Sequence, residues 1–255
     1  MLRVTVRFLA LWLLVLGPAL AQSGDPQAIN LAGQQRMLSQ RIVKSWAQIG
    51  LNVQPAISKR QLDEAVRRFE QNLRVLEPML ATPESRNALG GLHLAWAPLL
   101  TSVRGVIRQS DAALVDARAE DVLMAAERLT RVLQDQAAVA TGRWVNLAGR
   151  QRMLSQRLVK IYILRQWGLD NARLRDELES IQNEFSGALA SMQQRAGNSE
   201  ALRQELDKLA LQWEWLRTAL ATEGAESFRL ILAEGGDALL ELADEVTHLF
   251  EKSAP

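Results

Sequence analysis

Two arginines, Arg36 and Arg152, occupy the same place in a fifteen-residue block that occurs twice in the chain. The first copy, over residues 30–44, reads NLAGQQRMLSQRIVK, and the second, over residues 146–160, reads NLAGRQRMLSQRLVK. Packing alone rarely preserves identity, because cores tolerate hydrophobic swaps of similar volume. A guanidinium group presents parallel N–H donors in one plane and can hold two oxygens of a small planar oxyanion. The retained polar residues therefore predict a binding site.

A helix must carry this block, because its residues separate into two stripes when they are projected at 100° per residue. The broad stripe is apolar and is assigned to the core of its own bundle. The second stripe is made mostly of small residues, which let two helices approach closely, and an arginine lies at its centre. Its members are Ile29, Ala32, Gly33, Arg36, Gln40, Val43 and Ala47 in the first copy, and Val145, Ala148, Gly149, Arg152, Gln156, Val159 and Ile163 in the second. We expect these two faces to meet, with Arg41, Lys44, Arg157 and Lys160 directed to solvent.

Two guanidinium groups brought together in this way need an anion. At roughly 6 Å they repel by about 3 kcal/mol if the effective dielectric constant is near 20. No Asp or Glu lies between residues 25 and 63 or between residues 135 and 170, so neither motif helix carries a counter-ion. A bound oxyanion would supply one. An acid from a neighbouring helix, such as Glu64, Glu70 or Glu184, would instead make a structural ion pair.

The elements that position these arginines form an all-α chain, because Ala, Leu, Gln, Glu and Arg dominate at helical periodicity. The internal repeat divides the chain into two units. Outside the block, Phe69 falls opposite Phe185, and Trp96 meets Trp213 after a one-residue slip. We therefore predict two tandem four-helix bundles, over residues 22–140 and 141–255, whose motif helices pack together as a pseudo-dimer.

Capping residues predict where the helices of the first unit begin. Asp25 precedes Pro26, Ser58 with Gln61 resembles a capping box, and Thr82 precedes a third helix. A fourth helix is expected from about residue 116 to 140. The second unit should have helices near residues 141–167, 170–195, 199–233 and 237–252, with the last break at Gly235-Gly236.

The junction between the units has two possible forms. Thr141, followed by Gly142, aligns with the first helix start and could cap a new helix that turns back beside the first motif helix. Alternatively, one continuous helix from about residue 119 to 167 would separate the bundles end to end and leave the motif faces for a second chain. We favour the intramolecular arrangement, so that the protein would be a monomer with an internal pseudo-dimer rather than a homodimer.

The first 21 residues have the pattern of a cleavable signal peptide. Arg3 and Arg7 precede an apolar run, and an Ala-Leu-Ala sequence ends at Ala21. The run is shorter than the roughly 20 residues that a membrane span needs, which argues against an uncleaved anchor. We expect cleavage after Ala21 and a periplasmic mature protein.

The composition disfavours several functions. With 30 basic and 29 acidic residues, the chain lacks the excess of positive charge typical of nucleic-acid-binding proteins. It has no Cys and only two His, so we expect neither a metal site nor a cofactor. Ser39 and Ser155 have no nearby base, so we expect no enzyme. Trp144 precedes the second motif and could cover one end of an interface site.

The shared sequence Asn-Leu-Ala-Gly-x-Gln-Arg-Met-Leu-Ser-Gln-Arg resembles the signature of the PilJ-type, NarX-like periplasmic sensor domain found in nitrate and nitrite sensor kinases and in methyl-accepting chemotaxis receptors. That resemblance implies a four-helix bundle whose first helix lies at a two-fold interface. In nitrate-binding members, the arginine of the Arg-Met pair from each subunit holds the anion. By position this implies Arg36 and Arg152, with Gly33 and Gly149 allowing close approach. We expect Asn30, Asn146, Gln40 and Gln156 to line the same site.

The organisation of this chain departs from that family, whose members usually attach one such domain to transmembrane helices and a signalling module. Two domains without such a module predict a binding protein for a small oxyanion, nitrate or nitrite first, that signals through a membrane receptor or sensor kinase. The alternative is a structural or adaptor protein whose motif faces form a permanent helix interface.

Overall fold

The computed structural model describes residues 25–137, 139–197, 199–221 and 226–252, so the expected signal peptide over residues 1–21 lies outside the described residues. The first four α-helices are α1 (Pro26–Gly50), α2 (Pro55–Leu76), α3 (Pro83–Arg104) and α4 (Ala112–Asp135). The second four are α5 (Val139–Gln166), α6 (Ala172–Arg195), α7 (Glu200–Ala221) and α8 (Glu226–Lys252). The described residues contain no strand, which confirms the predicted all-α fold.

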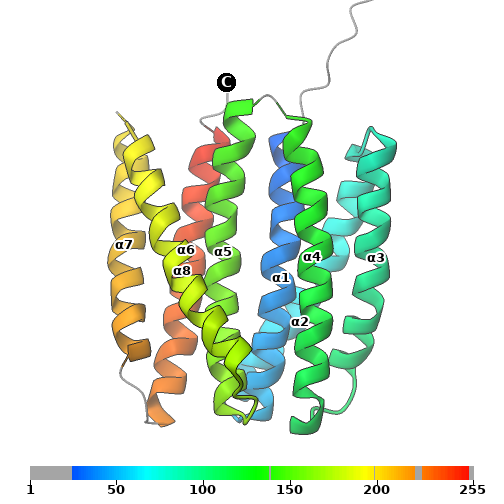
Figure 1. Cartoon of the computed structure of the whole chain (residues 1–255), viewed down its shortest axis with the longest axis vertical. Helices are drawn as coiled ribbons and strands as arrows, with labels where there is room; N and C mark the ends of the chain where they lie inside the picture. Colours follow the sequence, from blue (N-terminus) through cyan, green and yellow to red (C-terminus); the bar gives the residue numbers. More distant parts are fainter. Residues whose placement is uncertain (1–24, 138, 198, 222–225, 253–255) are drawn as a thin grey trace, which may run out of the picture.

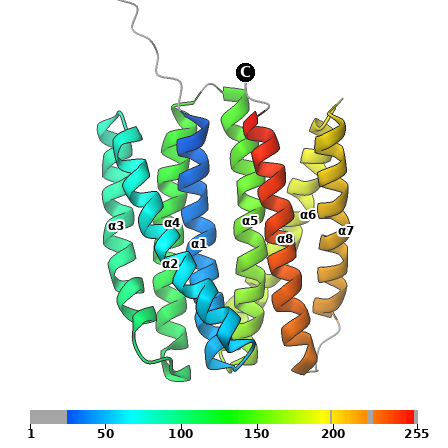
Figure 2. The same cartoon turned by 180° about the vertical axis from the view of Figure 1, so that it is seen from behind.

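The helices form two four-helix bundles joined side by side. Helices α1 and α5 lie at the centre and run in the same direction, while α3 and α7 lie at the two outer edges (Figures 1 and 2). Helix α1 packs against α2 and α4 of its own bundle and most extensively against α5 of the other. One continuous hydrophobic core spans both bundles. The predicted pseudo-dimer of motif helices is therefore confirmed.

Two of the predicted helix starts are confirmed and one is wrong. The side chain of Asp25 accepts a hydrogen bond from the backbone N–H of Gln27 at 2.8 Å, and the side chain of Thr82 accepts one from the backbone N–H of Ser85 at 3.1 Å. Ser58 does not cap α2, which begins earlier, at Pro55, because proline is pre-organised for the first helical position. The Ser58 hydroxyl instead donates to the Val53 carbonyl at 2.9 Å.

The chain reverses between α4 and α5, as the intramolecular arrangement requires. Helix α4 ends at Asp135 and α5 begins at Val139, slightly before the boundary predicted between residues 140 and 141. Thr141 therefore lies inside α5, and its predicted role as the capping residue is wrong. Ala140, a residue of high helix propensity, precedes it and extends the helix.

The predicted break at Gly235-Gly236 is also wrong, because α8 runs through both glycines. A Cβ atom at Gly236 would lie 2.3 Å from Cγ2 of Val159 on α5, and one at Gly235 would lie 2.5 Å from the Trp215 ring on α7. Interior glycine costs a helix about 1 kcal/mol relative to alanine. The glycines here let α8 pack closely against two helices, and that packing overrides their low propensity.

The close contact at Gly236 gives the first testable prediction. Gly236→Ala should lower the free energy of unfolding by about 1–3 kcal/mol, because the added methyl overpacks the contact with Val159 and this outweighs the gain in helix propensity. Chemical denaturation measures the change. The control is Gly187→Ala on α6, where a Cβ meets no atom within 4 Å and which should stabilise by up to about 1 kcal/mol. Equal effects of the two substitutions would refute the packing explanation.

Candidate functional site

Helices α1 and α5 bring Arg36 and Arg152 together in the interior of the molecule. Both side chains are fully buried. A Cβ atom added at Gly33 would lie 3.2 Å from Nη2 of Arg36 and 3.9 Å from Nη2 of Arg152. The two guanidinium groups are therefore neighbours. Gly149 leaves the same room for Arg152, whose Nη2 lies 3.1 Å from the corresponding place. Each glycine therefore makes space for the guanidinium group of its own helix, and Gly33 also makes space for the guanidinium of Arg152 from the facing helix.

Each arginine pairs with a carboxylate of its own bundle. Nη1 of Arg36 donates to Glu127 on α4 at 2.6 Å, and Nη1 of Arg152 donates to Asp244 on α8, also at 2.6 Å. Glu127 and Asp244 are separated by as many residues as Trp96 and Trp213, which the repeat aligns. The two acids therefore occupy equivalent positions of the repeat. An acid from a neighbouring helix was one of the two predicted counter-ions, but Glu64, Glu70 and Glu184 are not the acids that pair with Arg36 and Arg152. Glu184 bonds Arg150 and Glu70 lies near Arg104, while Glu64 lines a cavity.

The two asparagines of the motif hold the arginine of the opposite helix. Nη2 of Arg36 donates to Oδ1 of Asn146 at 2.7 Å, and Nη2 of Arg152 donates to Oδ1 of Asn30 at 2.5 Å. Asn146 in turn donates to Gln134 on α4, and Asn30 is hydrogen-bonded to Glu251 at the equivalent position of α8. Asn30 and Asn146 thus position the arginines across the interface between the bundles.

The predicted glutamines lie one turn beyond the arginines and are also fully buried. Nε2 of Gln40 donates to Ser39, and Nε2 of Gln156 donates to the Gly236 carbonyl at 3.0 Å. The side-chain oxygens of both have no hydrogen-bond partner, and neither do the Nε atoms of the two arginines. The centre of the interface therefore has unused donors and unused acceptors.

Charge within this interface affects both members of the Arg36–Glu127 pair. Burial lowers the pKa of the Arg36 guanidinium, and the nearby Arg150 and Arg152 charges lower it further, against the attraction of Glu127. Burial raises the pKa of Glu127, but Arg36 and Arg150 outweigh this effect and hold it below its usual value. Glu127 is 36% exposed, so the pair lies at the edge of the buried interface.

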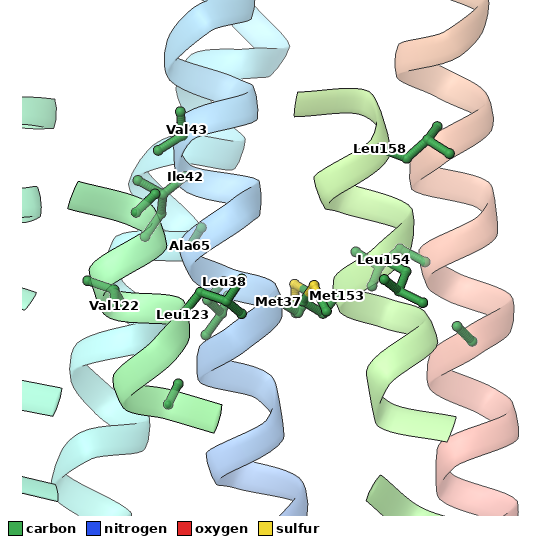
Figure 3. Packing of buried hydrophobic residues seen from close by; sticks show 14 of the residues in the cluster. Met37, Leu38, Ile42, Val43, Ala65, Val122, Leu123, Met153, Leu154 and Leu158 are labelled. Atoms are coloured by element: carbon green, nitrogen blue, oxygen red, sulfur yellow. The ribbon is translucent and has the colours of Figure 1, made fainter. Parts of the chain in front are cut away.

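Met37 and Met153 were not assigned to the interface from the sequence, yet they meet between α1 and α5 (Figure 3). Each follows a central arginine, and both are buried. Leu154 and Leu158 point instead toward α8, into the core of the second bundle (Figure 3). The Arg-Met pair of the motif therefore contributes one hydrogen-bonded and one apolar contact to the same interface.

The prediction that Lys44 and Lys160 face solvent is wrong, because both are fully buried. Nζ of Lys44 lies 2.5 Å from Asp237 on α8, and Nζ of Lys160 lies 2.7 Å from both Asp116 and Glu120 on α4. Each lysine therefore crosses to an acid of the other bundle. Single-helix projection could not show this, because the acids lie far away in the sequence.

Arg157 was also assigned to solvent, but it pairs with Glu120 at 2.7 Å and Glu177 at 3.2 Å. Arg41 is half-buried, and its charge helps to lower the pKa of Asp237.

Trp144 stacks on Phe250 of α8, with ring centroids 5.9 Å apart.

Among the described residues, no group of three or more His, Cys, Asp or Glu side chains is placed to hold a metal ion. Within the same part of the chain, none of the helices is both long and apolar enough to span a membrane.

The ion pair between Lys44 and Asp237, which joins the two bundles, predicts how the stability of the protein depends on pH. Burial raises the pKa of Asp237, but the charges of Lys44 and Arg41 outweigh this and lower it below its unfolded value. Its stabilising contribution is therefore complete above about pH 4 and is lost as the pH falls through the folded pKa. Asp237→Asn should lower the free energy of unfolding by about 3 kcal/mol at pH 7. Between pH 5 and pH 3, the stability of this variant should fall less than that of the parent protein.

Chemical denaturation at several pH values tests this prediction. The control is Asp63→Asn, which removes an exposed ion pair with Lys59 and should change stability by at most about 1 kcal/mol. If Asp237→Asn kept the full acid dependence of the parent, the role of this pair in acid unfolding would be refuted.

Comparison with known protein families matches the chain to the PilJ family, described as "Type IV pili methyl-accepting chemotaxis transducer N-term", over residues 20–134 and 136–234. No curated protein and no solved structure gives a significant match. The first matched region covers α1 to α4, the second covers α5 to α7 and ends within α8, and together they span most of the chain. Domains of this kind are sensor-type domains of chemotaxis transducers and are typically extracytoplasmic. The chain belongs to the PilJ family, with one copy of its sensor domain in each bundle.

Proposed function

We propose that this protein is an exported, non-enzymatic binding protein that holds a small planar oxyanion, nitrate or nitrite first, between Arg36 and Arg152. The observation that carries the proposal is the meeting of two fully buried guanidinium groups, each with an Nε–H that has no acceptor. A buried donor without a partner costs about 1–3 kcal/mol. An oxyanion that accepts from both arginines would remove this cost and add charge-assisted hydrogen bonds.

Glu127 and Asp244 act as internal competitors in this proposal. Each carboxylate accepts a hydrogen bond from Nη1 of one arginine and neutralises its charge when no ligand is bound. Both acids are partly exposed, at 36% and 41% of their side-chain area, and can turn toward water when an anion replaces them. Binding would then change the ionic contacts that join α1 to α4 and α5 to α8.

The output would be a small change in how the two bundles sit against each other. Arg36 contacts α4 of its own bundle and α5 of the other, so a shift of its guanidinium affects both contacts at once. A membrane-bound receptor or sensor kinase would read this change. A non-catalytic role is supported by the buried Ser39 and Ser155 hydroxyls, which donate to carbonyls of their own helices.

A structural or adaptor role is the second candidate, and the same two carboxylates favour it. Arg36–Glu127 and Arg152–Asp244 are complete ion pairs without any ligand. In that case the motif faces make a permanent interface, and the outer surface of the protein binds its partner.

Titration calorimetry with nitrate, nitrite and chloride separates these candidates. If the site binds an oxyanion, the chain should take up one nitrate or nitrite per molecule, and Arg36→Gln or Arg152→Gln should abolish binding while the protein stays folded. If the arginines are structural, each substitution should instead cost about 3–5 kcal/mol of stability, as expected when a buried ion pair is broken. The control is Arg104→Gln, at an exposed arginine on α3. Unchanged affinity in the Arg36→Gln/Arg152→Gln variant would exclude this site.

A further prediction concerns Glu127, which competes with the oxyanion for Arg36. Glu127→Gln removes the carboxylate that occupies Nη1 of Arg36, so nitrate or nitrite should bind more tightly by about tenfold, the equivalent of one charged hydrogen bond no longer displaced. The same calorimetric titration measures it. Weaker binding by this variant would show that Glu127 supports the site rather than competing for it.

Export is part of the proposal and rests on the N-terminal sequence pattern. The intact mass of the protein recovered from the periplasm should correspond to a chain that begins at Gln22. Recovery of the uncut chain in the membrane fraction would contradict cleavage after Ala21.

A further inference from the structure

Helix α3 presents an uncharged face at the outer edge of the first bundle (Figures 1 and 2). The exposed residues of α3 between positions 87 and 101 include no Asp, Glu, Lys or Arg. Leu94 lies at the centre of this face and is 79% exposed. Gly90, Gly91, Ala97 and Pro98 are also exposed, and at 3.6 residues per turn they lie within about 60° of Leu94. We call these residues, together with Leu94, the α3 face.

Contacts within the chain do not explain the residues of the α3 face. A Cβ atom at Gly90 or Gly91 would meet no atom within 4 Å, so neither glycine makes room for a neighbouring helix. Glycine and proline both weaken the interior of a helix, and Pro98 lies inside α3 as well. The α3 face therefore combines residues that reduce helix stability with a leucine exposed to water, and no described part of the chain covers it.

The equivalent surface of the second bundle is charged. In the register that aligns Trp96 with Trp213, Leu211 of α7 corresponds to Leu94 and is 76% exposed. Around this leucine, α7 carries charged side chains where α3 has glycine or alanine, namely Asp207, Lys208 and Glu214. The two outer helices thus share an exposed leucine but differ in charge, and the α3 face is the one suited to contact with another apolar surface.

Opposite charges lie at the two ends of the α3 face. Glu84 lies as many residues before Leu94 as Arg104 lies after it, and both side chains are exposed. Arg104 lies 3.5 Å from Glu70 at the surface, and its guanidinium is 63% exposed, so it can also donate to an acid of another molecule. The charge pattern of α3 is therefore complementary to that of a second α3 running in the opposite direction.

Two α3 helices packed antiparallel around a two-fold axis at Leu94 would use this pattern. A two-fold interface uses the same surface of both molecules, so a residue before Leu94 faces one that lies equally far after it. Glu84 of each molecule then lies level with Arg104 of the partner subunit. Gly91 lies level with Ala97 of the partner subunit, and such small residues let the two backbones approach closely.

We propose that the protein forms a homodimer in which the α3 faces of two copies pack antiparallel. Leu94 packs against Leu94 of the partner subunit, and Glu84–Arg104 ion pairs form at both ends of the contact. The pseudo-dimer of α1 and α5 stays inside each chain, so this association adds to it. One helix face buries less surface than the roughly 1,600 Å² of a standard interface, so we expect the dimer to dissociate at micromolar concentrations.

Sedimentation equilibrium of the chain from Gln22 tests the proposal, at concentrations from below to above the micromolar range. The average mass of the parent should rise with concentration toward twice that of a single chain. Leu94→Glu places two like charges at the two-fold axis, so this variant should stay at the mass of one chain. The matched control is Leu211→Glu on α7, a similarly exposed leucine, which should associate as the parent does.

Charge reversal tests the antiparallel arrangement. Glu84→Arg puts like charges at both ends of the contact and should raise the dissociation constant of the dimer by about tenfold. Glu84→Arg combined with Arg104→Glu restores opposite charges, so its dissociation constant should return to within about threefold of the parent value. All of the substituted positions are exposed, so we expect these variants to fold as the parent does.

A parent that stays at the mass of one chain at every concentration would overturn the proposal and leave the α3 face to a different protein. The proposal would also be overturned if Leu94→Glu associated as tightly as the parent, or if Glu84→Arg/Arg104→Glu associated no more tightly than Glu84→Arg. None of these results depends on whether the protein binds nitrate.

Discussion

A buried guanidinium group must find a counter-charge and acceptors for its N–H donors, and the whole interface between the two bundles follows from this constraint. Arg36 obtains its charge partner from α4 and its neutral acceptor from α5, and Arg152 does the same with α8 and α1. Each arginine therefore ties three helices together. Small residues around the arginines leave the space that these contacts need.

The buried lysines extend this arrangement along the same interface. Lys44 and Lys160 each cross to an acid of the other bundle, so neither bundle contains all the partners of its own motif helix. Breaking a buried ion pair is costly, since the remaining charge has no compensation. The two bundles are consequently interdependent, and a ligand that changes one ion pair acts on contacts across both of them.

The sequence predicted the parts of this structure that depend on local pattern. Periodicity placed Arg36 and Arg152 on a common face of small residues, and the repeat indicated that two such faces meet. The partner acids could not be identified, because Glu127 and Asp244 lie on helices distant in the sequence whose rotation was not known. Lys44 was misplaced because a long side chain can reach across a helix pair. Gly235 and Gly236 were read as a break because their low propensity is visible in the sequence, whereas their close packing is not.

The two copies of the repeat differ in the residues around the retained motif. Arg150 lies between Glu127 on α4 and Glu184 on α6, whereas the equivalent place between α1, α2 and α8 is a cavity lined by both acids and arginines. The retained motif therefore keeps the interface the same in both copies, while the surfaces beside it differ.

We conclude that one chain supplies both halves of the paired interface. The chain has no native cysteine, so Met37→Cys with Met153→Cys gives a single reactive pair at the contact seen in Figure 3. Treatment of the dilute protein with a short bis-maleimide, followed by intact mass measurement, tests the claim directly. We expect one internal cross-link at the mass of a single chain. A product at the mass of two chains, without the internal cross-link, would contradict it and place the interface between molecules.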